Sequence, residues 1–417
     1  MKRYNNETNW SITNIFSIIL LLAALVLGSW HSLQRPKWSD FVAPTMTRVN
    51  HASTSNKSVD STFLPGTGAH TVHAASLILL HDGNVRAFWF AGSNEGMPDV
   101  VIQSAIWDTK TGGWQQPTVV IDRVTAQRQL QRFVAKLGNP VPVRMADGKL
   151  ALFFVTASIG GWATSSINVM TSTDEGATWG SAQRLITSPW MNLSTLVKSP
   201  AITFADSHIG LPVYHEFIAT FGELLRIDSS TNSMQLIDKR RMSQGQRTLQ
   251  PVIFIDDAKT GSAYFRQGRR TGIERLIATS HTQDAGYTWR VTKHLLLPNP
   301  NSAISGLILA NGNRLLVFND LEEDRYRLVL AMSKLMDDKS TYSPWQIIQT
   351  LEDDSARPKK QRRRFSYPYL LSDNNGDVHL VYTWSQERIK SAQLKSAIKH
   401  VRFSAAYLND IQLKQEA

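Results

Sequence analysis

The chain has 417 residues, of which 42% are hydrophobic and 12 are tryptophan, so it can bury a large core. It contains no cysteine, which excludes a disulfide framework, a thiol nucleophile and a cysteine-ligated metal site. The 11 histidines never occur at the spacing of a zinc-binding helix, and we expect neither a metal nor a cofactor. The formal net charge of +11 favours an acidic partner.

The N-terminal part begins with an uncharged, mostly apolar run, WSITNIFSIILLLAALVLGSW, at residues 10–30. About 20 such residues can cross the hydrocarbon core of a bilayer. We therefore expect a transmembrane anchor at residues 10–30, which would follow a short cytoplasmic N-terminus at residues 1–9. The alternative is a cleaved signal peptide, for which Leu27-Gly28-Ser29 is a poor cleavage site.

Both interpretations place the rest of the chain outside the cytoplasm. With an anchor it would stand on the periplasmic side of the cytoplasmic membrane, and after cleavage it would be secreted or periplasmic. Residues 31–66 are rich in Ser, Thr and Asn, which is typical of a flexible tether. Residues 67–417 remain for the folded domain.

Six segments of this domain have the pattern of a β-hairpin, in which two apolar runs flank an Asp, Asn or Gly turn. They are residues 75–90, 139–154, 199–214, 250–265, 302–318 and 366–382. Their starts lie about 51 to 64 residues apart, enough for four short strands and their turns. That spacing predicts an all-β fold, a six-bladed β-propeller. A β-sandwich is the alternative, but it needs far fewer strands.

Two copies of one turn motif support the repeat. Residues 172–179 read STDEGATW and residues 282–289 read TQDAGYTW, 110 residues apart. In each copy the Asp can accept backbone N–H bonds, the Gly can adopt a positive φ, and the Trp can cover the hairpin. Degenerate versions follow Asp108 and Asp228. We expect the two complete motifs on outer hairpins of alternate blades.

This motif resembles the Asp-box, or BNR repeat, of the sialidase (neuraminidase) superfamily. The resemblance extends over about residues 70 to 405, and is greatest to the bacterial predicted neuraminidase or exo-alpha-sialidase-like group. It implies a sialidase-like propeller. Because the motif lies away from the catalytic centre in that superfamily, it implies fold more strongly than chemistry.

Polar residues at the ends of apolar strands are the candidates for chemistry, because a propeller presents them at one mouth of its channel. In the first blade, Glu95 and Asp99 follow an apolar strand, and either could supply a catalytic carboxyl group or a solvated turn. In the third blade, Glu216 ends an apolar strand, and in the sixth, Tyr367 begins one. A carboxylate can activate a phenol by accepting its proton.

The expected substrate-binding residues also cluster at strand ends. Arginine side chains in the fourth blade can bind carboxylates bidentately. Polar residues beside prolines at the starts of other blades would complete a ring around one opening. The candidates are His73, Asn139, Lys198, Arg247, Gln250, Arg266, Asn301, Trp384 and Arg388.

The family resemblance implies specific roles for some of these residues. Sialidases hold the substrate carboxylate with three arginines, and use an Asp as acid/base and a Tyr–Glu pair as nucleophile. The resemblance would match the pair to Tyr367 and Glu216, the acid to Asp99 or Glu95, and anion contacts to Arg247, Arg266 and Arg388. The first arginine normally lies in an Arg-Ile-Pro string. Residues 68–75 lack that string, and His73 occupies the place.

Three functions follow as expectations. The first is a sialidase-like exo-glycosidase acting on an extracytoplasmic, acidic glycan. The second is a noncatalytic propeller that binds a surface polysaccharide. The third is a polysaccharide lyase, in which Tyr and His act as base and acid on a uronic acid.

A basic run at residues 357–364 carries six positive charges. It is typical of either a solvated loop or a surface that attracts an acidic partner. The candidates for that partner are phospholipid headgroups, reached through residues 10–30, and an anionic polysaccharide. Nucleic acid is not expected as a partner for a chain outside the cytoplasm.

Overall fold

The computed structural model describes residues 12–33, 38–44, 57–66, 71–188, 192–230, 233–244, 247–268, 275–338, 340–387 and 394–414. The chain divides into two compact units, residues 1–38 and residues 39–417. The first contains helix α1 (Ile12–Leu33), onto which most of the expected transmembrane segment falls. Among the described residues, no helix is long and apolar enough to cross a membrane, and the structure does not support the expected anchor.

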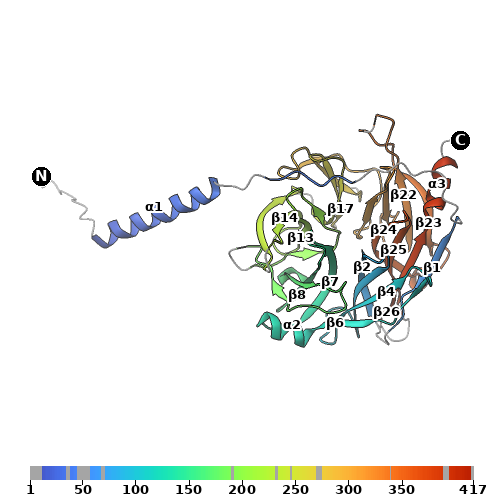
Figure 1. The fold of residues 1–417 in the computed structure, drawn as a ribbon, viewed down its shortest axis with the longest axis horizontal. Helices are drawn as coiled ribbons and strands as arrows, with labels where there is room; N and C mark the ends of the chain where they lie inside the picture. Colours follow the sequence, from blue (N-terminus) through green and yellow to red (C-terminus); the bar gives the residue numbers. More distant parts are fainter. Residues whose placement is uncertain are drawn as a thin grey trace, which may run out of the picture. The chain divides into compact units, whose positions relative to one another are not determined.

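The second unit is a propeller of six antiparallel sheets, which confirms the predicted fold (Figure 1). The first blade contains β2 (Thr71–Leu79), β3 (Val85–Gly92), β4 (Val101–Asp108), β5 (Gly113–Trp114) and β6 (Thr118–Asp122). The second contains β7 (Lys136–Arg144), β8 (Leu150–Ala157), β9 (Ser165–Ser172) and β10 (Gln183–Arg184). The third contains β11 (Leu196–Val197), β12 (Ile202–Thr203), β13 (Ile209–His215), β14 (Phe221–Asp228) and β15 (Gln235–Arg241).

The remaining blades follow in chain order. The fourth contains β16 (Thr248–Ile255), β17 (Gly261–Gln267), β18 (Ala278–Thr282) and β19 (Arg290–Thr292). The fifth contains β20 (Ser305–Ile308), β21 (Arg314–Phe318), β22 (Arg327–Ser333) and β23 (Gln346–Asp353). The sixth contains β24 (Arg364–Ser372), β25 (Val378–Glu387), β26 (Leu394–Phe403) and β1 (Val59–Phe63). Short helices α2 (Arg123–Leu130), η1 (Trp162–Thr164), η2 (Lys359–Gln361) and α3 (Ala405–Lys414) lie outside the sheets.

Strand β1 corrects the boundary expected for the tether. It pairs antiparallel with β26 and forms the outer strand of the sixth blade. The N-terminal strand of the propeller thus completes the blade formed by its C-terminal strands. Earlier in the tether, the N–H of Phe41 donates to Ala258 O at 2.7 Å, and that of Val42 to Thr203 O at 2.9 Å. These bonds attach residues 41 and 42 to the third and fourth blades.

The blades form because their second strands are apolar on both faces. Every residue of β3 and β8 is buried. Such strands need cover on each side, and in a propeller the neighbouring blades supply it. Phe88 and Phe90 of the first blade share one cluster with Leu152 and Phe154 of the second. The core therefore lies between successive blades.

The two Asp-box motifs occupy the predicted hairpins. The first connects β9 to β10 and the second connects β18 to β19, in alternate blades. Asp174 accepts hydrogen bonds from the backbone N–H and the hydroxyl of Thr178, at 2.9 and 2.6 Å, and these bonds lower its pKa to about 2. Asp284 accepts the same pair from Thr288, at 2.8 and 2.6 Å.

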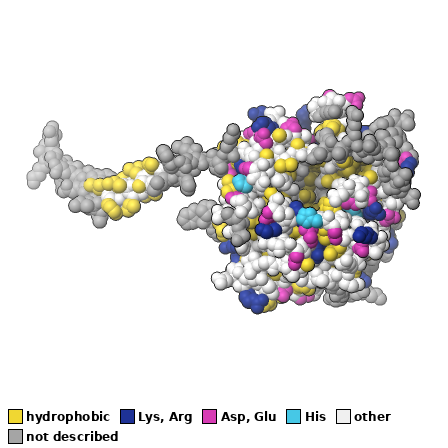
Figure 2. All heavy atoms as spheres, in the orientation of Figure 1, with side chains coloured by type: hydrophobic (Ala, Val, Ile, Leu, Met, Phe, Trp, Pro, Cys, Tyr) yellow, Lys and Arg dark blue, Asp and Glu magenta, His cyan; other side chains and the backbone are white. Residues whose placement is uncertain are grey.

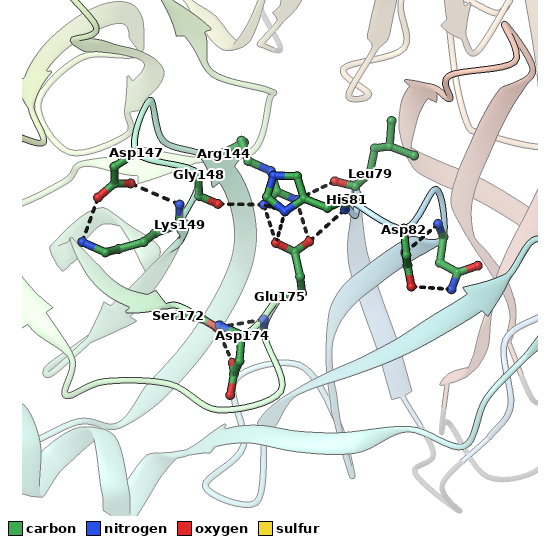
Figure 3. Close-up of polar contacts among 12 residues, drawn as sticks. Leu79, His81, Asp82, Arg144, Asp147, Gly148, Lys149, Ser172, Asp174 and Glu175 are labelled. Carbon is green, nitrogen blue, oxygen red and sulfur yellow. Dashed lines mark hydrogen bonds and ion pairs between the residues drawn. The ribbon is translucent and has the colours of Figure 1, made fainter.

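The first motif also joins two blades. Glu175 accepts a bidentate pair of hydrogen bonds from Arg144, one of them at 2.7 Å, and a hydrogen bond from the His81 backbone N–H at 3.2 Å (Figure 3). His81 belongs to the turn between β2 and β3, in the first blade. Hydrogen bonding to Arg144 lowers the pKa of Glu175 to about 2, so this contact is ionic at neutral pH.

Two turn glycines, one in the second Asp-box and one in the turn between β2 and β3, provide a test of the packing. Gly286 has φ = +85°, and a Cβ there would lie 2.9 Å from Leu224 Cδ2. Gly83 has the same φ but nothing within 4 Å. We expect Gly83→Ala to cost about 1–2 kcal/mol from backbone strain alone, and Gly286→Ala to cost about 1–3 kcal/mol more from overpacking. Equal losses in urea denaturation would contradict this packing.

Candidate active site

The innermost strands share a feature that directs side chains into the channel. Four of them carry a β-bulge at an equivalent level. The register shifts fall between His73 and Ser76, Gly138 and Val141, Leu249 and Val252, and Ser366 and Tyr369. Within these bulges Asn139, Gln250 and Tyr367 adopt φ values of 45°, 48° and 56°. Non-glycine residues in this region are strained, and such strain concentrates at functional sites.

The sequence contains a signal for three of these bulges. Asn139, Gln250 and Tyr367 each precede a proline. Because proline has no N–H, it fits a point at which the ladder of hydrogen bonds is broken. In the third blade the interruption is wider. The inner position is divided between β11 and β12, and Lys198 lies between them.

Gln250 is the centre of the polar network at this mouth. Its amide nitrogen donates to Tyr367 Oη at 3.0 Å and contacts Tyr214 Oη at 3.3 Å. Asn139 Nδ2 also donates to Tyr214 Oη, at 3.3 Å. The carbonyl oxygen of Gln250 accepts from Arg266 at 3.0 Å. One buried amide thus fixes two phenols and a guanidinium from three other strands.

Three cations converge on the same mouth. Arg266 Nε donates to Asn301 Oδ1 at 2.8 Å, and Arg325 donates to Asn301 O at 2.8 Å. Lys198, 4% exposed, donates to Pro368 O and lies 5.9 Å from the ring of Tyr367. None of the three has a carboxylate within 4.0 Å among the residues that the structure describes. The hydrogen bonds that these three cations form go to neutral oxygen acceptors.

Burial and crowding change the protonation of these groups. Burial lowers the pKa of Lys198 to about 7. Burial, reinforced by the charge of Arg266, lowers the pKa of Arg325 to about 10. Burial also lowers the pKa of His73 to about 3, and the charges of Arg325, Lys198 and Arg266 add to the effect. At neutral pH His73 is therefore neutral, while Arg325 stays charged.

His73 lies in the same cluster. Its Nδ1 is 2.8 Å from Thr383 Oγ1, and its ring centroid is 4.2 Å from that of Tyr367. His73, Thr383, Arg325 and Glu95 line a cavity of about 160 Å³.

Two of the three expected carboxylates lie at this mouth. Burial raises the pKa of Glu216, Arg266 opposes that shift, and the charge of Glu95 adds to it. Glu95 accepts from Trp162 Nε1 at 3.1 Å. Asp99 instead accepts from the N–H and the hydroxyl of Ser93, at 2.8 and 2.9 Å, which is a turn-stabilising contact. The structure therefore favours Glu95 over Asp99 as the catalytic carboxylate of the first blade.

The expected Tyr367–Glu216 pair does not form a direct contact. The phenol of Tyr367 bonds to Gln250, and no described hydrogen bond joins it to Glu216. In this contact the amide of Gln250 donates to the phenol oxygen, so it does not occupy the place of a group that accepts the phenolic proton. The pairing of Tyr367 with Glu216 stays a prediction.

Most of the predicted site residues converge. Contacts with one another or with shared neighbours unite His73, Asn139, Lys198, Glu216, Gln250, Arg266, Asn301, Tyr367 and Glu95. Trp384 is elsewhere, because it packs against Phe63 and the core of the fifth and sixth blades. Arg247 is exposed ahead of β16, and its carbonyl accepts from Gly268. Arg388 lies outside the described residues.

Sequence reasoning missed three members of the site. Tyr214 is the second-last residue of the apolar strand β13 and resembles a core residue, while Thr383 is one of several hydroxyl residues in β25. Arg325 lies in the loop between β21 and β22, beside Asp324 with φ = 67°. The loop that carries Arg325 connects two strands of its blade, as the loop that carries Glu95 does. That equivalence was the only sequence feature that could have indicated Arg325. Within the described ranges, no group of three or more His, Asp or Glu side chains is arranged to hold a metal ion.

The other end of the channel is chemically different. It holds a cavity of about 500 Å³ lined mainly by apolar inner-strand residues, among them Leu77, Ile202, Ile255, Leu307 and Leu371. The face seen in Figure 2 is hollowed at its centre, with hydrophobic side chains inside the hollow. The polar groups that could carry out chemistry thus gather at one mouth only among the described residues.

Comparisons with solved structures support the fold. The NanB sialidase of Streptococcus pneumoniae superposes with a TM-score of 0.62 at 12% identity, over 82% of this chain and 70% of that one. The leech intramolecular trans-sialidase gives 0.60 at 14% identity, over 86% and 71%. A protein of unknown function from Dyadobacter fermentans gives 0.60 at 12% identity, over 83% and 99%. At these identities the likeness concerns the fold.

A search of curated protein sequences finds no significant match. The model of the BNR repeat-like domain matches residues 83–380, which include both Asp-boxes and most of the six blades. The chain therefore belongs to the BNR repeat-like domain family.

Proposed function

We propose that the protein is a glycoside hydrolase that acts on an acidic glycan at the polar mouth of the propeller. One observation carries the proposal. Arg266, Arg325 and Lys198 converge on this mouth with no described carboxylate within 4.0 Å of them, in the neighbourhood of Glu216, whose pKa is raised. Uncompensated buried charge is costly, and an anionic ligand would remove that cost.

The chemistry follows from the positions of the charged groups. The two guanidinium groups and the ammonium group hold the carboxylate of an acidic sugar. Glu216, whose pKa is raised by burial, acts as the general acid: its protonated form donates the proton to the departing glycosidic oxygen. Glu95, held by the indole of Trp162, acts as the second carboxylate. Tyr367 and Tyr214, fixed by Gln250, orient the sugar ring.

A specific observation favours one second candidate, a uronic-acid lyase. Neutral His73 lies against the ring of Tyr367 and next to the same cations. A neutral imidazole can remove a proton from the carbon beside a carboxylate, and a phenol can protonate the leaving oxygen. The cations would stabilise the intermediate charge in that reaction.

Product analysis separates the two reactions. A hydrolase incorporates one oxygen from labelled water into the released sugar and forms no carbon–carbon double bond. A lyase forms an unsaturated uronate, which absorbs in the ultraviolet, without uptake of solvent oxygen. We expect labelled oxygen in the product and no new absorbance. The opposite result would transfer the catalytic roles to His73 and Tyr367.

The pH dependence of substrate affinity tests the role of Lys198. With a pKa of about 7, this side chain is cationic below that pH and neutral above it. Affinity for an acidic substrate should therefore weaken as the pH rises through about 7. Lys198→Met should bind the substrate more weakly at low pH and lose most of this dependence. Exposed Lys149, which pairs with Asp147 in a distant turn, provides the control Lys149→Met.

We also propose that the protein acts outside the cytoplasm, on the basis of the uncharged apolar run at residues 10–30. Fusion of alkaline phosphatase behind residue 417 tests this, because the enzyme is active only after export. Loss of reporter activity on deletion of residues 10–30 is the expected result. A fusion that is inactive with the full chain would contradict export.

A further inference from the structure

The basic run at residues 357–364 is not a uniformly solvated loop. Arg363 forms a bidentate contact with Asp354, with Nε 2.8 Å from Oδ2, and Arg357 pairs with the same carboxylate at 3.4 Å. Asp354 is only 2% exposed. These two arginines anchor the loop. The other cations of the run are Lys359, Lys360, Arg362 and Arg364, and none of them contributes to this anchor.

Three of those cations line a large cavity. Lys359, Arg362 and Arg364 border a space of about 730 Å³, together with Arg275, Arg325 and Tyr326. We call this space the basic cavity. Its volume is in the range of small-molecule sites, about 300–1,000 Å³. Arg362 is held in place by bonds to Arg357 O and Ser355 O, and its guanidinium lies 4.2 Å from the ring of Tyr326.

The basic cavity adjoins the candidate active site. Arg325 and Arg364 line both this cavity and the smaller one that contains His73 and Glu95. Asn301, which also borders the basic cavity, accepts the hydrogen bond from Arg266. The two cavities therefore share part of their wall, which places the basic cavity directly beside the candidate active site.

The charge of the basic cavity is unbalanced. Five cations and two carboxylates line it. Glu323 pairs with Arg275 at 2.9 Å, and Asp324 pairs with Arg364 at 2.8 Å. Arg325, Lys359 and Arg362 have no described carboxylate partner, which leaves an excess of three positive charges in a concave site. A concave site of one sign concentrates anions of the other sign.

We propose that the basic cavity is a second subsite for the same glycan chain, and that the substrate is a polyanionic oligosaccharide or polysaccharide. The unit next to the one bound by Arg266 and Arg325 then carries its own carboxylate or sulfate, which contacts Lys359 and Arg362. This inference rests on the proposed function, because it extends the site where the first acidic unit binds. The hollow shape and its continuity with that site favour a glycan chain over a flat lipid surface.

The test uses two lysines that differ by one position. Lys359 lines the basic cavity, whereas Lys360 belongs to the same run but does not line it. Lys359→Glu and Lys360→Glu change the net charge equally. The affinities of the full-length protein for galacturonate and for galacturonate oligomers of increasing length are measured by calorimetry at low salt. Arg266→Met is measured in parallel to report on the first site.

We expect the wild-type protein to bind the longer oligomers more tightly than the monomer. Lys359→Glu should weaken oligomer binding about tenfold, whereas Lys360→Glu should leave it nearly unchanged. Equal losses in the two variants, or oligomers that bind no better than the monomer, would overturn the second subsite. Unchanged binding of the monomer by Arg266→Met would instead overturn the proposed function. Equal loss of binding to phosphatidylglycerol vesicles in both variants, with oligomer binding unaffected, would indicate a lipid surface.

Discussion

Replacing Arg266 with methionine should lower kcat/KM for an acidic glycan at least about thirtyfold, because removing one partner of a charge pair that the bound substrate would bury costs about 2–5 kcal/mol. Methionine retains the length and the apolar stem of the side chain. It removes the donors to Asn301 Oδ1 and Gln250 Oε1 together with the positive charge. Arg266→Lys should give an intermediate loss, since lysine keeps the charge without the planar fork.

The measurement is steady-state kinetics on the acidic glycan and on its reduced, uncharged analogue. Discrimination between the two should largely disappear in Arg266→Met. Arg290 lies on the outer strand of the same blade and is exposed, so Arg290→Met is the matched control and should keep wild-type kinetics. An Arg266→Met protein that still prefers the acidic form would exclude this residue from carboxylate binding.

Replacing Glu216 with glutamine should reduce kcat about 10² to 10⁴-fold, the usual effect of removing a general acid. The variant keeps the shape of the side chain and cannot donate a carboxylic proton. The loss should be smallest for aryl glycosides with acidic leaving groups, which depart without protonation. The alkaline side of the pH–rate profile should also flatten, because the titrating group with the raised pKa is absent.

Glu223 provides the control for this substitution. It lies in the same blade, but its carboxylate contacts His215 Nε2 at 2.6 Å rather than the mouth. Glu223→Gln should change stability more than rate. If Glu216→Gln turns over substrates of every leaving group at the wild-type rate, Glu216 is not the acid, and Glu95 becomes the candidate.

The blades were predictable because their signals are local. Each hairpin is encoded by two apolar runs and a turn within about 20 residues, and the Asp-boxes place Asp174 and Asp284 by contacts that extend only to Thr178 and Thr288. The closing strand β1 pairs with β26 across almost the whole chain. Its composition, VDSTF, contains no pattern that names a distant partner.

The site was predictable where a strained backbone position coincides with a recognisable residue pattern. Asn139, Gln250 and Tyr367 precede prolines at bulges, and all three reach the channel. Tyr214 was missed because an aromatic residue in an apolar strand has the same pattern whether its hydroxyl meets the core or Gln250. Lys198, Arg266 and Arg325 form an anion site only because they lie close together in the folded chain. That proximity depends on how three blades close around the channel.

A crystal structure of the Glu216→Gln protein soaked with an acidic sugar, such as galacturonate, tests the central claim most directly. The account predicts that the sugar occupies the polar mouth, with its carboxylate within hydrogen-bond distance of the guanidinium groups of Arg266 and Arg325. A sugar found in the apolar cavity at the other end of the channel would contradict the account. So would a carboxylate turned towards solvent, or a cationic site left empty at a saturating concentration of the sugar.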